Sequence, residues 1–118
     1  MKILIVDDDV DVRSLLEDAL IDAGYSVIMA RNGEEGLAGL REGHVSLVIT
    51  DLIMPGKDGL EFIRDLREEF ADMKVVAMTG GIYDFPMVGQ VDGADQLITK
   101  PFHIKDVLAL VSDLIGES

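Results

Sequence analysis

The feature that most constrains the fold is an alternation along the chain between two kinds of segment. The first kind is a short, continuous run of apolar residues that is not interrupted by polar ones. Such runs lie at residues 2–6, 25–30, 46–50, 74–78 and 96–99. Continuous apolar runs of this length are typical of β-strands that are covered on both faces, as in a parallel sheet.

Segments of the second kind space their apolar residues at three- and four-residue steps, which is typical of helices. Between the first two runs these residues are Val12, Leu15, Leu16, Ala19, Leu20 and Ala23. Near the end of the chain they are Ile104, Val107, Leu108, Val111 and Ile115. Asn32 with Glu35, and Asp58 with Glu61, have the spacing of helix-capping pairs. Helices are therefore expected between the strands.

Regular alternation of strands and helices predicts an α/β fold, in which a parallel sheet carries helices on both faces. Five strands suit the flavodoxin-like (βα)5 topology, a doubly wound sheet with the strand order 2-1-3-4-5. A chain of 118 residues has the size of one domain with one core. We therefore expect a single domain over residues 1–118.

The fourth helical segment fits this pattern poorly. Residues 80–95 contain several helix-breaking residues, namely Gly80, Gly81, Gly89, Gly93 and Pro86. In a helix interior, glycine costs about 1 kcal/mol and proline about 3 kcal/mol relative to alanine. We expect a loop up to Phe85 and then a short or irregular helix that starts near Pro86.

Charge and composition restrict the classes of partner. The formal net charge of −13 repels DNA, RNA and anionic lipid, whereas it favours cations and basic protein surfaces. The sequence contains no cysteine, which excludes disulfides, thiolate zinc sites and thiol nucleophiles. No apolar run approaches the roughly 18 residues that span a bilayer, and the first apolar run is too short for a signal peptide. We expect a cytoplasmic protein without direct contacts to nucleic acid or membrane.

Polar residues follow the predicted strands, at the point where each strand ends. They are Asp7, Asp8 and Asp9, then Asp51, Thr79 and Lys100. The carboxyl ends of parallel strands meet at one edge of a sheet, and ligands bind there, beside the point where the strand order reverses. We therefore expect these side chains to converge. The stretch LIMPGKDG after Asp51 then forms a loop that leaves its carboxylate accessible.

Carboxylates that lie this close together require a cation. At about 4 Å and an effective dielectric constant near 20, each pair repels by roughly 4 kcal/mol. Mg²⁺ suits a site with few oxygen ligands, because it keeps several waters and often shares a phosphate. Lys100 offsets a further charge, and Thr79 offers a hydroxyl donor. This set of groups suits phosphoryl transfer, with Asp51 as a nucleophile that forms an acyl phosphate.

The stretches ILIVDDD, VITDLIMPGKDGLEFI, MTG and TKPF resemble, in this order, the receiver domain of two-component response regulators. The resemblance covers essentially the whole chain. It implies a switch rather than an enzyme, which accepts a phosphoryl group from a sensor histidine kinase or a phosphotransfer protein. It also implies that the signal passes, by a change of surface conformation, to a downstream protein or an output domain.

The resemblance also implies roles for single residues. Asp51 matches the phosphoacceptor, Asp8 the direct Mg²⁺ ligand and Asp7 the acid that acts through water. The backbone carbonyl of Ile53 matches a further metal ligand. Thr79 matches the hydroxyl that moves to the phosphoryl group, and Lys100 matches the lysine that pairs with it. In the family, the bond between this lysine and the following proline is cis.

Two features depart from the family's pattern. Three residues before the lysine, the family usually has an aromatic ring that turns inward on activation, and this chain has Leu97. Residues 80–93 lie on the family's usual output face and are rich in Gly and Pro. We hypothesise that ordering of this segment replaces the ring movement.

Alternative functions remain at this stage. A degenerate receiver binds partners without being phosphorylated, and the two departures favour it. A phosphatase of the haloacid dehalogenase type needs a second acid two residues after the nucleophile, where this chain has Ile53. A flavin-binding module needs a Ser/Thr-rich phosphate loop where this chain has three aspartates, which repel phosphate. Among single residues, Asp9 is expected to cap the first helix rather than bind metal, and Met78 to fill the core.

Overall fold

The structure, a computed structural model, describes residues 1–52, 59–80 and 93–116. Its strands are β1 (Lys2–Val6), β2 (Ser26–Ala30), β3 (Val45–Asp51), β4 (Lys74–Thr79) and β5 (Gln96–Thr99). Its helices are α1 (Val10–Asp22), α2 (Gly33–Glu42), α3 (Gly59–Glu69) and α4 (Ile104–Ile115). All neighbouring strands pair in parallel, in the order β2-β1-β3-β4-β5. The predicted flavodoxin-like α/β fold and its strand order are confirmed.

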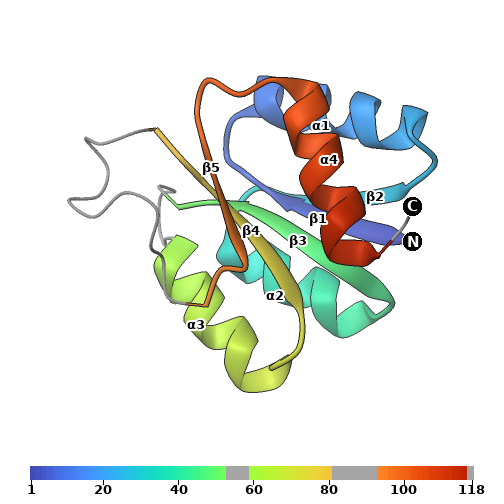
Figure 1. Cartoon of the computed structure of the whole chain (residues 1–118). Helices are drawn as coiled ribbons and strands as arrows, with labels where there is room; N and C mark the ends of the chain where they lie inside the picture. The colour runs from blue at the N-terminus through green and yellow to red at the C-terminus, as the bar shows by residue number, and fades with distance from the viewer. Residues whose placement is uncertain (53–58, 81–92, 117–118) are drawn as a thin grey trace.

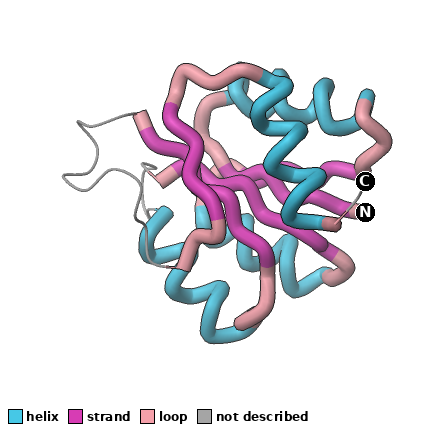
Figure 2. The backbone as a smooth tube through the Cα atoms, viewed as in Figure 1, coloured by secondary structure: helices cyan, strands magenta, loops and turns pink. Residues whose placement is uncertain are grey.

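The sheet lies between two helical layers, with α1 and α4 on one face and α2 and α3 on the other (Figures 1 and 2). Strand β1 lies inside the sheet and serves both faces. Its Ile3 and Ile5 belong to the cluster under α1 and α4, whereas Leu4 and Val6 belong to the cluster under α2 and α3. Burial of each such side chain contributes about 1.5–3 kcal/mol. The prediction of strands covered on both faces is confirmed for the inner strands β1, β3 and β4, whereas the edge strands β2 and β5 are only partly buried.

Polar side chains fix the starts of the first two helices. The carboxylate of Asp9 accepts hydrogen bonds from two backbone N–H groups in the first turn of α1, at 2.9 and 3.4 Å, so its predicted capping role is confirmed. The side chain of Asn32 accepts from the N–H of Glu35 at 2.9 Å. The carboxylate of Glu35 accepts in turn from the N–H of Arg31 at 2.8 Å, one residue before the cap. The expected capping pair is present, with its return bond displaced by one residue.

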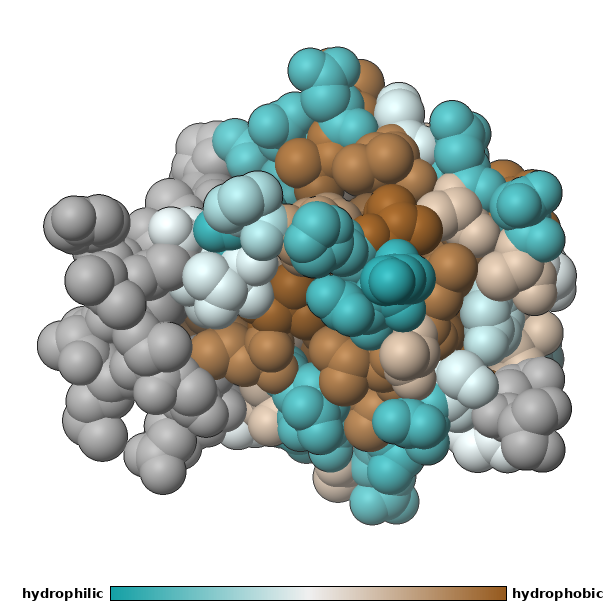
Figure 3. Space-filling model, turned by 45° about the horizontal axis from the view of Figure 1, so that its top comes forward, coloured by the Kyte–Doolittle hydropathy of each residue, from teal (hydrophilic) through white to brown (hydrophobic). Residues whose placement is uncertain are grey.

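Two of the apolar residues whose spacing predicted α1 are exposed in the structure. Leu15 is 49% exposed, and Ala23 is exposed because it follows the last residue of the helix. Only a narrow stripe of the helix is fully buried, namely Leu16 and Leu20, one turn apart. Leu15 lies beside that stripe and reaches solvent. Figure 3, turned toward the α1 and α4 side, shows hydrophobic side chains at the surface, interrupted by hydrophilic ones.

The start of β5 is held by two hydrogen bonds between Asp95 and Val75 of β4, and by one side chain of α3. The guanidinium of Arg67 donates to the carbonyl of Gly93 from Nε (2.9 Å) and Nη2 (2.5 Å). It also donates to the carbonyls of Ala71 and Met73, at 2.9 and 2.5 Å, and to the carboxylate of Asp95 at 3.1 Å. All five N–H donors of the arginine are thereby used. The strand is thus anchored to α3 and to the turn that precedes β4.

Two predictions lie outside the described residues. One is the irregular fourth helix, because residues 81–92 are not described, and the other is the capping role of Asp58. Helix α3 is described from Gly59 onward. None of the helices in the described part of the chain combines the length and the hydrophobicity that a bilayer-crossing helix needs.

Candidate functional site

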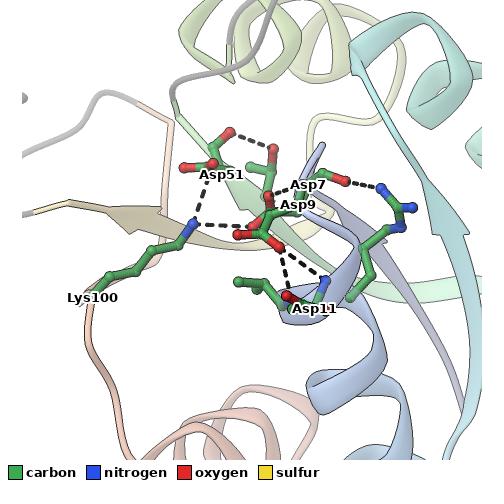
Figure 4. Close-up of polar contacts among 8 residues, drawn as sticks. Asp7, Asp9, Asp11, Asp51 and Lys100 are labelled. Carbon is green, nitrogen blue, oxygen red and sulfur yellow. Dashed lines mark hydrogen bonds and ion pairs between the residues drawn. The ribbon is translucent and has the colours of Figure 1, made fainter.

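Side chains that follow four of the strands gather at the carboxyl edge of the sheet, as the sequence predicted. Val6 pairs with Thr50 in the register of β1 and β3, so Asp7 and Asp51 occupy neighbouring strand ends. One carboxylate oxygen from each of Asp7, Asp8 and Asp51 lies within 4.8 Å of the other two. Figure 4 shows Asp7 and Asp51 beside Lys100, which reaches them from the loop after β5.

Burial differs sharply among the three acids. Asp7 is 0% exposed and Asp51 is 7% exposed, whereas Asp8 is exposed to solvent. Both carboxylate oxygens of Asp7 are held, Oδ1 by the N–H of Asp9 at 2.9 Å and Oδ2 by the ammonium of Lys100 at 3.1 Å. Buried carboxylates need such partners, because desolvation of an unpaired charge is costly. The site therefore has a fixed, buried floor and one open acid at its mouth.

Lys100 joins the two buried acids. Its Nζ lies 3.1 Å from Oδ2 of Asp7 and 3.3 Å from Oδ2 of Asp51. Burial lowers the pKa of Lys100, but the negative charges of Asp7 and Asp51 and the hydrogen bonds to them outweigh burial and raise this pKa above 10.5. The side chain is therefore a cation at neutral pH. Its stabilising contribution is present at neutral pH and is lost only as pH rises through the raised pKa.

The chain around Lys100 is held against β4. The N–H of Lys100 donates to the carbonyl oxygen of Thr79 at 2.7 Å. The peptide bond between Lys100 and Pro101 is cis, as the resemblance implied. Thr79 itself is 4% exposed at the end of β4 and follows Met78, which pairs with Asp51 in the strand register. Thr79 and Lys100 therefore lie at neighbouring strand ends, on the same edge of the sheet as Asp51.

The backbone of Asp51 lies directly against the start of α3. The N–H of Gly59 donates to the carbonyl of Leu52 at 2.9 Å. A Cβ atom at position 59 would overlap the carbonyl oxygen of Asp51 and the Cα of Leu52. Only glycine fits there, a requirement that the sequence analysis did not identify. Ile53, whose backbone carbonyl was a candidate metal ligand, lies outside the described residues.

The donor set fits a hard divalent cation. Carboxylate oxygens are the ligands that Mg²⁺ prefers, and an octahedral ion with bonds near 2.1 Å places opposite ligands about 4.2 Å apart. The oxygens of Asp7, Asp8 and Asp51 need to move little from their spacing within 4.8 Å to meet that geometry. Three carboxylates beside one ammonium also leave an excess of negative charge. The site is therefore suited to Mg²⁺.

The remaining candidate residues lie elsewhere or play structural roles. Met78 is fully buried in the core, which confirms its interpretation. Leu97 is half-buried and packs against the cluster under α2 and α3. His44 lies exposed in the turn after α2, and His103 is the N-cap of α4. Sequence reasoning missed Arg13, whose Nη1 donates to the backbone carbonyl of Asp7 at 2.6 Å. No residue pattern signals this bond, because every residue carries a backbone carbonyl that could accept it.

Comparison with known sequences gives a consistent result. Residues 3–112 match the family model described as response regulator receiver domain. The chain is 39% identical over 116 residues to the probable transcriptional regulator ycf27 of Pyropia yezoensis, covering 97% of this chain and 47% of that protein. It is 36% identical over 114 residues to the transcriptional regulatory protein ResD of Bacillus subtilis, covering 97% and 48%. The chain thus spans about half the length of these curated relatives.

Solved structures of response regulators are also similar to this chain. The response regulator TrrA of Thermotoga maritima, solved in complex with Mg²⁺–BeF, is similar with a TM-score of 0.86 and 34% identity, covering 96% of this chain and 97% of that one. The chemotaxis response regulator CheY4 of Vibrio cholerae is similar with a TM-score of 0.84 and 28% identity, again covering 96% and 97%.

Proposed function

The chain belongs to the receiver domain family of response regulators, and from that premise we propose that Asp51 accepts a phosphoryl group in a Mg²⁺-dependent reaction. The observation that carries the proposal is the shared ammonium of Lys100, which holds the buried carboxylates of Asp7 and Asp51 beside the open Asp8. This arrangement places a nucleophile, a metal-binding pair and a fixed cation around one point.

In the proposed reaction, a carboxylate oxygen of Asp51 attacks the phosphorus of a phosphohistidine. The bond from phosphorus to the imidazole nitrogen breaks, and its electron pair stays on that nitrogen. The product is an acyl phosphate on Asp51. Asp7 and Asp8 would hold Mg²⁺, which, when bound, neutralises charge on the transferred oxygens. Lys100 pairs with the same oxygens, so its cation is needed before and after transfer.

The conformational change that carries the signal is proposed to begin at the same edge of the sheet. The hydroxyl of Thr79 at the end of β4 moves to the new phosphoryl group, as in the family that the chain resembles. Because Thr79 precedes Gly80 and residues 81–92 in the sequence, we propose that the change passes into that segment. We propose that this change is the signal, with half-buried Leu97 in place of the family's usual ring.

We further propose that the chain is a switch and not an enzyme acting on external phosphoesters, because the second residue after Asp51 is Ile53 and not an acid. A sensor histidine kinase or a phosphotransfer protein supplies the phosphoryl group, which places the protein in the cytoplasm. The relatives named as transcriptional regulators are about twice as long as the matched region. Their names support an output domain or a partner that controls transcription.

The test is the intact mass of the protein after incubation with acetyl phosphate or phosphoramidate and MgCl₂. We expect the gain of one phosphoryl group, which is lost in Asp51→Ala and absent with EDTA. If no donor, including a purified histidine kinase, modifies the chain, the degenerate receiver becomes the better description. In that case the unmodified form is the one that binds the partner.

A further inference from the structure

We propose that Arg13 is a positioning residue for the Mg²⁺ site, because it holds the peptide group that joins Asp7 to Asp8. The inference rests on the Mg²⁺ site of the proposed function. It assigns a role at that site to a side chain of α1 that carries no ligand oxygen and lies outside the acidic cluster.

The backbone of Asp7 is held at both ends. Its N–H donates to the carbonyl of Ala30 at 3.1 Å, which continues the pairing of β1 with β2. Its carbonyl oxygen accepts from Nη1 of Arg13 at 2.6 Å, a short, charge-assisted bond. Its carboxylate accepts from the N–H of Asp9, and the carbonyl of Asp9 accepts from the N–H of Arg13 at 3.1 Å. The turn from β1 into α1 is thereby closed into a ring of hydrogen bonds.

The bond to the Asp7 carbonyl controls Asp8 through the geometry of the peptide group. The carbonyl oxygen of Asp7 and the nitrogen of Asp8 belong to one planar unit. When Arg13 fixes the oxygen, it also fixes the direction in which the chain enters Asp8. The described residues give the exposed carboxylate of Asp8 no hydrogen bond. Its position at the site therefore depends on the backbone that Arg13 orients.

Charge and positioning predict opposite effects for Arg13. A guanidinium next to the acids repels a second cation, so its charge alone would weaken Mg²⁺ binding. Orientation of Asp8 would strengthen binding, since partners that orient ligands commonly account for about 10–100-fold in metal affinity. The sign of the change on removal of Arg13 therefore distinguishes the two roles.

The test is a titration of the full chain with MgCl₂, in which the NMR shifts of the backbone amides at the site report the binding affinity. We expect Arg13→Met to bind Mg²⁺ about tenfold more weakly, the smaller end of the range for orienting partners. Arg13→Gln is too short to reach the Asp7 carbonyl and should show the same loss, so either variant suffices if the other does not fold. Arg13→Lys, which keeps a donor of similar reach, should recover most of the affinity.

Lys74→Met is the matched control, because Lys74 is an exposed cation at the opposite end of β4. It removes the same charge and should leave the affinity near that of the wild type. If Arg13→Met and Arg13→Gln bind Mg²⁺ as tightly as the wild type or more tightly, the positioning role is overturned while the proposed function stands. If the wild type itself binds no Mg²⁺, both fall together.

Discussion

The two ends of edge strand β5 are both tied to the molecule by a cation, yet the two cations do different work. At the start, Arg67 directs its five donors mainly to backbone carbonyls, with Asp95 as the one carboxylate. Past the end, Lys100 lies between the carboxylates of Asp7 and Asp51. At the start of β5, every donor of Arg67 has an acceptor. Past the end of β5, the carboxylates outnumber the single ammonium of Lys100, so an excess of negative charge remains.

The comparison indicates how one short strand combines stability with reactivity. The charge of Arg67 is matched by backbone carbonyls and by the single carboxylate of Asp95, so we expect this end to contribute to folding and not to bind a metal ion or a phosphoryl group. The acids around Lys100 repel one another until a further cation arrives. Added Mg²⁺ and added phosphoryl groups should therefore act at the Lys100 end and leave the Arg67 end unchanged.

The largest expected effect is at the Lys100 end. Lys100→Met removes the cation that pairs with the transferred oxygens, and we expect the rate of Asp51 phosphorylation by phosphoramidate to fall about 100-fold, as on loss of a preorganised donor. Intact mass against time measures the rate. Arg67→Met, assayed under conditions where it is folded, should react at nearly the wild-type rate. Equal losses in both variants would erase the distinction between the two ends.

The next effect is at the Arg67 end. Arg67→Met removes the donor to the carbonyls of Gly93, Ala71 and Met73 and the ion pair with Asp95, and we expect the free energy of unfolding in urea to fall by about 2 kcal/mol. Arg64→Met, at an exposed position on the same helix, should change it by less than about 0.5 kcal/mol. A loss at Arg67 no larger than that at Arg64 would mean that the five bonds contribute nothing to stability.

A smaller expected effect is the stabilisation of the fold by bound Mg²⁺, which should depend on the Lys100 end and not on the Arg67 end. At a MgCl₂ concentration about tenfold above the dissociation constant, the free energy of unfolding should rise by about 1.4 kcal/mol. The increase should be the same in the wild type and in Arg67→Met, and much smaller in Asp8→Asn. Urea midpoints with and without MgCl₂ measure it. An undiminished increase in Asp8→Asn would place the ion away from the acidic cluster.

The smallest effect concerns an exposed ion pair that serves as a reference for both ends. Arg41 donates to Glu69 at 2.5 and 3.0 Å, and this hydrogen bond holds the pKa of Glu69 below 4.5. A carboxylate whose pKa is lowered in the folded state stabilises the fold at pH values above its unfolded-state pKa. This stabilisation is lost as the pH falls through the folded-state pKa. The small stability difference between the wild type and Glu69→Gln should therefore shrink below pH 4.5. A difference that is constant across acid pH would contradict this.

Sequence patterns predicted the parts of the molecule that depend on chain order and polarity. The convergence of Asp7, Asp51 and Lys100 followed from the rule that parallel strands present their carboxyl ends at one edge. The sequence patterns did not predict the width of the buried stripe on α1, because the spacing of apolar residues does not show where the sheet ends beneath the helix. Leu15 shares the apolar spacing of the helix and is nevertheless exposed.

The contacts of Arg13 and Arg67 also could not be predicted from the sequence. Both side chains bind backbone carbonyls, and because every residue carries such a carbonyl, the residue types do not show which one is bound. Gly59 is similar, since the overlap that excludes a side chain there involves only the backbone of Asp51 and Leu52. Features of this kind are determined by the packed backbone and not by the local order of residue types.

Gly59 has a further consequence for anyone who studies this protein genetically. A methyl group at that position must displace either α3 or the segment that carries Asp51, although it alters no charge and no ligand. Gly59→Ala is therefore expected to act as a loss-of-function allele that keeps the complete acidic cluster, with loss of acetyl phosphate labelling as its readout. It offers a way to silence the site by shape alone, as a complement to alleles that remove its charge.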